Sequence, residues 1–161
     1  GVSLEEAKEG LEHFELTKNR LEWIDGKNDI HLLNDAYNAS PTSVKAALSY
    51  FSDIKTEGKK IAVLGDVLEL GDQSKELHES IAEAVDLDKY KAVLLYGDEM
   101  EALYKVLKER EENDNVAHFS GDKDPLIKEI ENIAEPEDIV LFKSSNGTDL
   151  LSVVDQLKVE E

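Results

Sequence analysis

Residues 61–71 have the sequence Ile-Ala-Val-Leu-Gly-Asp-Val-Leu-Glu-Leu-Gly, an apolar run that leads into a glycine-bounded loop with two carboxylates. Four consecutive apolar residues are typical of a parallel strand that is covered on both of its faces. A second run of this kind, Ile139 to Phe142, lies near the end of the chain. Together the two runs predict a parallel β-sheet with helices on both sides.

Further β-like runs flank these two, and helical patterns separate most of them. The expected strands are Arg20 to Ile24, Ile30 to Leu33, Ile61 to Leu64, Ala92 to Tyr96, Val116 to Phe119 and Ile139 to Phe142. A turn-rich segment, residues 25–29, joins the first two, which form either a hairpin or two separate strands of one sheet. Because strands alternate with helices beyond this point, we predict a doubly wound, mostly parallel α/β sheet.

The helix start signals are of two kinds. Ser3 with Glu6 and Asp98 with Glu101 have capping-box spacing, whereas Ser40-Pro41 and Asp124-Pro125 place proline at the first helical position. An apolar stripe after Gly71, formed by Leu77, Ile81, Ala84 and Val85, predicts another helix. The last helix is expected from about Thr148 to Leu157.

Length and composition limit the class of protein. The chain has 161 residues, of which 40% are apolar, and this suits one globular domain. A net charge of −19 makes binding to nucleic acid or to an anionic membrane unfavourable. The absence of cysteine excludes disulfides and thiolate chemistry, and the chain has neither an apolar run long enough for a membrane span nor a signal-peptide pattern. We expect a cytoplasmic location. Because Gly1 is not methionine, we also expect a piece of a longer protein.

Loops that follow the strands are the candidate binding sites, because open α/β sheets bind ligands outside the carboxyl ends of their strands. Residues 34–41, 65–71, 97–98 and 143–147 form four such loops. The 97–98 loop is best explained as a turn and helix cap. The other three carry side chains that suit charged or polar ligands.

Each of these three loops also has a purely structural interpretation. The 34–41 loop could supply only turn formers and a helix N-cap. Asp66 and Glu69 could be solvated loop acids; they are too few for a metal cage, although two carboxylates can assist Mg²⁺ held by phosphates. Lys143 could lie at a solvent-facing strand end.

Several common motifs are missing from the sequence. It has neither a Gly-x-x-x-x-Gly-Lys-[Ser/Thr] loop nor a Gly-x-Gly-x-x-Gly segment, the usual means of gripping a nucleoside triphosphate or a dinucleotide. The four histidines, His13, His31, His78 and His118, lack metal-ligand spacing and are expected to be structural or surface residues. The residues alone therefore indicate an α/β domain with a ligand-binding edge built from loops.

Taken in order, these loops resemble the C-terminal domain of the Mur ligases. The matching segments are Asn19-Arg20-Leu21-Glu22, Asn34-Asp35-Ala36-Tyr37-Asn38-Ala39-Ser40-Pro41, Gly65 to Gly71 and Lys143-Ser144-Ser145. Three residues depart from the family pattern: Ser40 replaces asparagine, Val67 replaces methionine and Ser144 replaces glycine. Within the family, the segments are most similar to the branch that adds D-alanyl-D-alanine to UDP-N-acetylmuramoyl-tripeptide in peptidoglycan synthesis.

The resemblance implies a six-stranded Rossmann-like domain over residues 1–161, with the UDP-sugar-binding and ATP-binding domains absent from this chain. In the family reaction, ATP phosphorylates the tripeptide carboxylate, and the dipeptide amine then attacks the acyl phosphate. The implied partners are ATP, Mg²⁺ held mainly by the absent central domain, UDP-N-acetylmuramoyl-tripeptide, D-alanyl-D-alanine and the remaining domains. This chain alone is expected not to ligate.

Site residues carry over by motif position. The expected nucleotide contacts are Arg20, Asp35, Tyr37 and Asn38. The expected contacts on the dipeptide side are Asp66, Glu69, Lys143, Ser145 and Asn146. The resemblance implies that Arg20 reaches the ATP phosphates, that Asp35 accepts hydrogen bonds from the ribose hydroxyls and that Lys143 binds the dipeptide carboxylate. No residue of this domain is expected to be catalytic alone or to bind metal.

Two other interpretations stay open. A related amide ligase, such as MurE, folylpolyglutamate synthetase or cyanophycin synthetase, would have the same domain, but the Asp-Asn-Pro-Arg signature of MurE is missing. A noncatalytic receiver-like module would use Asp66 as phosphoacceptor. It would need an acidic pair after its first strand, which Asn34-Asp35 matches only weakly.

Overall fold

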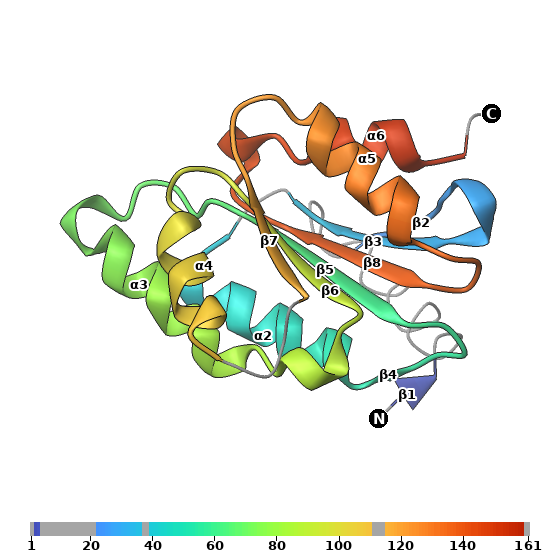
Figure 1. Ribbon diagram of the computed structural model, residues 1–161, viewed down its shortest axis with the longest axis horizontal. Helices are drawn as coiled ribbons and strands as arrows, with labels where there is room; N and C mark the ends of the chain where they lie inside the picture. Colours follow the sequence, from blue (N-terminus) through green and yellow to red (C-terminus); the bar gives the residue numbers. More distant parts are fainter. Residues whose placement is uncertain (1, 4–21, 37–38, 111–114, 160–161) are drawn as a thin grey trace.

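The structure, a computed structural model, describes residues 2–3, 22–36, 39–110 and 115–159. A six-stranded sheet lies at its centre with helices on both faces (Figure 1). The predicted doubly wound α/β fold is therefore confirmed. None of the helices in the described ranges is long and apolar enough to cross a membrane.

The central sheet has the strand order β2-β3-β8-β5-β6-β7. Its strands are β2 (Glu22–Asp25), β3 (His31–Asp35), β5 (Lys60–Gly65), β6 (Ala92–Tyr96), β7 (Val116–Phe119) and β8 (Ile139–Lys143). Only the β2–β3 pair is antiparallel, so the first two strands form a hairpin. A separate two-stranded sheet pairs β1 (Val2–Ser3) with β4 (Ile54–Lys55).

The helices divide between the two faces of the sheet (Figure 1). One face is covered by α2 (Pro41–Ser52), α3 (Ser74–Ser80) and α4 (Glu101–Lys108), and the other by α5 (Asp124–Ile133) and α6 (Leu151–Leu157). Short 3₁₀ turns lie at Lys27–Asp29, Gly71–Gln73, Ile81–Ala84, Leu87–Lys89 and Asn146–Thr148.

The last strand shows why its sequence is continuously apolar. Ile139 and Leu141 pack into the core beneath α2, whereas Val140 and Phe142 pack into the core on the opposite face. Successive side chains of a strand point to opposite faces, so a strand covered on both sides needs apolar residues at every position. β8 therefore holds the two halves of the molecule together.

The helix start signals are confirmed in part. Ser40 caps α2, because its Oγ accepts the Ser43 N–H at 3.0 Å and Ser43 Oγ accepts the Ser40 N–H at 2.8 Å. α5 begins at Asp124, one residue earlier than predicted, and Asp122 accepts the Asp124 N–H at 3.0 Å.

Two other helices are shorter than the sequence pattern suggested. The helix after Gly71 ends at Ser80 and continues as a 3₁₀ turn. The last helix begins at Leu151 rather than near Thr148, because Asp149 adopts a left-handed backbone with φ 58°. The helix expected after Ser3 lies outside the described residues.

Candidate functional site

The carboxyl ends of β3, β8 and β5 bring the predicted loops together. In the sheet register, Asp35 lies beside Lys143, and Lys143 lies beside Leu64. Because β8 lies between β3 and β5, the loop that follows it starts beside the ends of both strands, and it contacts the loop after β5. Three segments that are far apart in the sequence thus lie together at the end of the sheet where the parallel strands finish. We call this end the carboxyl edge.

An ion pair between Asp35 and Lys143 lies at the centre of this edge. Lys143 Nζ is 2.8 Å from Asp35 Oδ2, and the two side chains are only 5% and 12% exposed. The interpretation of Lys143 as a solvent-facing strand end is therefore wrong, because its ammonium is buried against a carboxylate. Burial of either charge alone would be costly, so each of the two groups requires the other.

The neighbouring Asn34 fixes the start of the loop after β3. Its Oδ1 accepts the Ala36 N–H at 3.1 Å, and its Nδ2 donates to Glu22 Oε1 at 3.4 Å. Such an Asx turn supplies a partner for a backbone group that leaves the sheet. The other predicted nucleotide contacts, Arg20, Tyr37 and Asn38, lie outside the described residues.

Asp66 has a partner that the sequence did not predict. It is buried, and its Oδ1 accepts the Met100 N–H at 2.9 Å, at the start of α4. Asp98, the predicted cap, is exposed and makes no side-chain cap, so the predicted capping box is wrong. The carboxylate reaches α4 from the neighbouring strand because Gly97 leaves room for it: with φ 114°, a Cβ there would lie 2.3 Å from Asp66.

Burial raises the pKa of the Asp66 carboxyl above its ordinary value. The backbone N–H groups of Glu99 and Met100 offset part of this rise, because they stabilise the charged form. The interpretation as a solvated loop acid is therefore wrong for Asp66, but it fits Glu69, which is exposed.

His78 also holds the 65–71 loop in position, a role that sequence reasoning did not predict. The ring is fully buried; its Nε2 accepts the Val67 N–H at 3.1 Å and its Nδ1 lies 2.7 Å from the Ser74 carbonyl oxygen. Because Nε2 accepts a hydrogen bond and Nδ1 faces a carbonyl oxygen, the ring carries its hydrogen on Nδ1 and none on Nε2. The apolar stripe pointed to Leu77 instead, which is only half-buried.

The other described histidines also have structural partners. His31 lies 3.3 Å from Glu137, and His118 Nε2 lies 2.7 Å from the Gly97 carbonyl oxygen. The prediction of structural or surface histidines is thus confirmed for the described residues, and His13 lies outside them.

The loop after β8 is tied to the loop after β5. Ser145 Oγ accepts the Leu68 N–H at 2.9 Å, while Ser145 N–H and Thr148 Oγ1 donate to the Asp66 carbonyl at 3.1 and 2.9 Å. Ser145 is therefore buried within the loop contact. Asn146 remains exposed at the rim, as Glu69 does.

Ser144, which replaces the glycine of the family pattern, fits without left-handed backbone. It is fully buried and is not among the residues with positive φ. Gly65 on the adjacent strand makes room for its side chain, because a Cβ at Gly65 would lie 2.8 Å from Ser144 Cβ. The departure from the family pattern is thus accommodated locally.

Metal binding by this edge alone is not supported. Among the described residues, no three His, Asp or Glu side chains are grouped to hold a metal ion. Asp35 is paired with Lys143 and Asp66 with an amide N–H. These two carboxylates do not fit a dedicated Mg²⁺ site.

A family model described as "Mur ligase, glutamate ligase domain" matches residues 19–146. The chain is 37% identical, over 98% of its length, to the UDP-N-acetylmuramoyl-tripeptide–D-alanyl-D-alanine ligase of Bacillus subtilis (strain 168), and covers 34% of that protein. It is 32% identical over 96% of its length to the ligase of the same name from Rickettsia prowazekii (strain Madrid E), and covers 33% of it. The chain spans about a third of the length of these relatives.

Solved structures show the same likeness. MurF ligase from Thermotoga maritima, in complex with ADP, matches 85% of this chain with a TM-score of 0.69 and 26% identity; the match covers 30% of that chain. A crystal structure of MurF from Acinetobacter baumannii matches 87% of this chain with a TM-score of 0.71 and 26% identity, and the match again covers 30% of that chain.

Proposed function

This chain belongs to the Mur ligase family, and on that basis we propose that it is the C-terminal domain of an ATP-dependent ligase that adds D-alanyl-D-alanine to UDP-N-acetylmuramoyl-tripeptide. The observation that carries this proposal is the match, over 98% of the chain, to a ligase with that named activity. The geometry of the carboxyl edge is consistent with it. In this proposal, the UDP-sugar-binding and ATP-binding domains and Mg²⁺ belong to the upstream part of a longer, cytoplasmic protein.

The proposed reaction has two steps. The tripeptide carboxylate attacks the γ-phosphate of ATP and releases ADP, and the dipeptide amine then attacks the acyl carbon and expels inorganic phosphate. Positioning and charge neutralisation dominate such chemistry. We assign this chain the task of holding the nucleotide and the dipeptide in place, and no covalent step.

The Asp35–Lys143 pair suggests how the two ligands share this edge. Asp35 would accept hydrogen bonds from the ribose hydroxyls, and Lys143 would face the carboxylate of D-alanyl-D-alanine. Because Lys143 Nζ is already 2.8 Å from Asp35, one ammonium would lie between two carboxylates. The pair would then link the nucleotide side of the site to the dipeptide side.

The remaining predicted residues divide by exposure. Glu69 and Asn146 are exposed and are available to a polar dipeptide. Asp66 and Ser145 hold the two loops in position through the contacts described above. Arg20, Tyr37 and Asn38 complete the proposal on the nucleotide side.

The proposal is tested by joining this chain to the first two thirds of the B. subtilis relative, a fusion called here the joined enzyme. We expect phosphate release that requires ATP, UDP-N-acetylmuramoyl-tripeptide and D-alanyl-D-alanine together, and none from the isolated chain. The intact relative serves as the positive control. Activity with a single amino acid in place of the dipeptide would favour another amide ligase, and activity of the isolated chain would contradict the proposal.

The receiver-like alternative receives no support. Asp66 would have to be accessible as a phosphoacceptor, yet its carboxylate is buried and accepts the Met100 N–H. The family match is also to a ligase domain. We therefore propose no second function for this edge.

A further inference from the structure

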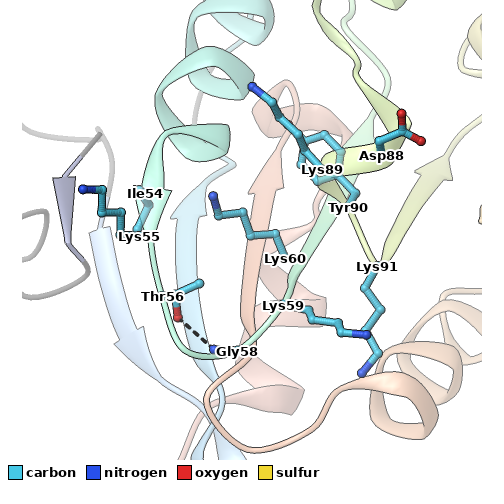
Figure 2. Close-up of a pocket in the computed structure, with 10 residues that line it drawn as sticks. All are labelled: Ile54, Lys55, Thr56, Gly58, Lys59, Lys60, Asp88, Lys89, Tyr90 and Lys91. Atoms are coloured by element: carbon cyan, nitrogen blue, oxygen red, sulfur yellow. Dashed lines mark hydrogen bonds between the residues drawn. The ribbon is translucent and has the colours of Figure 1, made fainter.

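A hollow lies at the opposite end of the sheet, beside the amino ends of β5 and β6, which we call the amino edge. It has a volume of about 510 Å³ and is lined by Ile54, Lys55, Thr56, Gly58, Lys59, Lys60, Asp88, Lys89, Tyr90 and Lys91. Figure 2 shows that these residues come from two segments, 54–60 and 88–91, on either side of the hollow. We call it the lysine pocket, because five of its ten lining residues are lysines.

The pocket holds positive charge that the described residues do not neutralise through ion pairs. Lys91 is paired, with Nζ 2.9 Å from Asp138 and 3.4 Å from Glu135. In the described part of the chain, the four other lysines, Lys55, Lys59, Lys60 and Lys89, form no ion pair. Asp88 is the only carboxylate among the lining residues that the structure describes. This is unexpected in a chain with 37 acidic and 18 basic residues.

Two of the ammonium groups are held in place. Lys60 Nζ donates to the Ser52 carbonyl at 2.8 Å, and Asp138 holds Lys91 from the other side. Burial lowers the pKa of Lys60, and the nearby charge of Lys89 lowers it further, against an opposing effect of Asp53. The charge of Lys89 thus disfavours the charged form of Lys60, and a bound anion would offset this effect.

The loop between β4 and β5 is also rigidly anchored. Thr56 Oγ1 accepts the Gly58 N–H at 3.3 Å (Figure 2), and Asp138 Oδ1 accepts the Lys59 N–H at 2.8 Å. Gly58 packs against the Glu137 carbonyl so closely that a Cβ would lie 2.2 Å from its oxygen. The lysines of this loop thus project from a fixed backbone.

We propose that the lysine pocket binds a small, multiply charged anion of the polyphosphate type. Ammonium groups are compact point charges that suit phosphate oxygens without a fixed geometry, and four of them require several negative charges on one ligand. The volume lies in the range of small-molecule sites. Ile54 and Tyr90, the two large hydrophobic residues in the described lining, are buried, so they offer a peptide little exposed apolar surface.

Titration of the ¹⁵N-labelled 161-residue chain with sodium tripolyphosphate at physiological salt tests this proposal. We expect saturable amide shifts in residues 54–60 and 88–91, without matching shifts at Asp35 and Lys143. Lys60→Met and Lys89→Met should each weaken binding at least about tenfold. Lys128→Met removes the same charge from an exposed position on α5 and should change the affinity less than about twofold.

Other outcomes would overturn the proposal. These are an absence of saturation, shifts only at the carboxyl edge, equal weakening by Lys128→Met, or tighter binding of a glutamate-rich peptide. Because Lys89 is exposed, its variant keeps the test decisive if Lys60→Met fails to fold. A parallel titration with ATP distinguishes the two sources of such an anion. It compares the affinity of a nucleotide for the same residues with that of free polyphosphate. No ligation is measured, so the result is independent of the proposed function.

Discussion

The two edges of the sheet treat charge in opposite ways. At the carboxyl edge, the Asp35–Lys143 pair and Asp66 are buried, and each has a partner within the chain. At the amino edge, Asp138 is buried with its partners, but four of the lysines that line the hollow form no ion pair with any described residue. The difference teaches that buried pairing fixes the position of a side chain before a ligand arrives, whereas unpaired exposed charge leaves neutralisation to a ligand.

The largest stability effect should come from the carboxyl edge, by Gly97→Ala. Alanine would have to adopt φ 114° with its Cβ 2.3 Å from the Asp66 carboxylate. Backbone strain plus displacement of a charged hydrogen-bond acceptor should cost about 4 kcal/mol. Urea unfolding measures this loss.

Gly121→Ala is the matched control for this substitution. Gly121 also has positive φ, 74°, but nothing lies within 4 Å of its Cβ position. We expect a cost of about 1 kcal/mol from the backbone alone. Equal losses for the two variants would show that Asp66 does not depend on the space at Gly97.

At the amino edge, Asp138→Asn should lower the free energy of unfolding by less than Gly97→Ala does, and this loss should depend on pH. Burial alone would raise the pKa of Asp138, but the N–H groups of Lys59 and Glu135 and the Lys91 ammonium outweigh it and lower the pKa. The stabilisation is therefore complete above the unfolded pKa of about 3.9 and is lost as pH falls through the lower folded value. We expect a cost of about 2–3 kcal/mol at pH 7.

Unfolding free energies from pH 7 to pH 2 measure this dependence. The difference between the parent chain and Asp138→Asn should shrink as the pH falls below about 4. Asp98→Asn, at an exposed carboxylate, should leave the profile unchanged. A difference that stays constant with pH would show that the Asp138 charge does not support this edge.

The smallest effect is expected for Ser144→Gly, which sharpens the description of the carboxyl edge. It removes a buried hydroxyl that donates to the neighbouring Ser145 carbonyl at 3.1 Å, so it should cost less than about 1 kcal/mol. Gly65→Ala should cost more, about 2 kcal/mol, because its Cβ would meet Ser144 Cβ at 2.8 Å.

The double variant tests this fit between neighbouring strands. In the Ser144→Gly background, the cost of Gly65→Ala should fall, as measured by thermal unfolding. Strict additivity would mean that Ser144 and Gly65 do not accommodate each other.

Local patterns predicted the strands well. Ala92 to Tyr96 and Val116 to Phe119 were predicted to the residue, because continuous apolar runs leave few alternatives for a buried strand. The sequence did not decide whether β2 and β3 form a hairpin, since residues 25–29 suit several kinds of turn. The position of β8 between β3 and β5 depends on contacts between distant segments, which no local pattern contains.

The site was predicted at the level of loops but not of partners. Asp35 and Lys143 were each assigned to a different ligand, although they contact each other across 108 positions of the sequence. Asp98 was predicted as a cap because capping rules consider only neighbours along the chain, whereas Asp66 approaches from another strand. The lysine pocket was missed because the expectation for open sheets directs attention to the carboxyl ends.

The most direct test of the ligase account is a double-mutant cycle on Asp35 and Lys143 in the joined enzyme. Asp35→Asn and Lys143→Met should each lower kcat/KM for ATP and for the dipeptide about 10- to 100-fold, since each loses a charged contact of about 1.5–3 kcal/mol. The double variant should be little worse than the poorer single variant, because both substitutions break the same pair. Unchanged kinetics for both ligands, with only a lower Tm, would contradict the account and leave the pair a purely structural role.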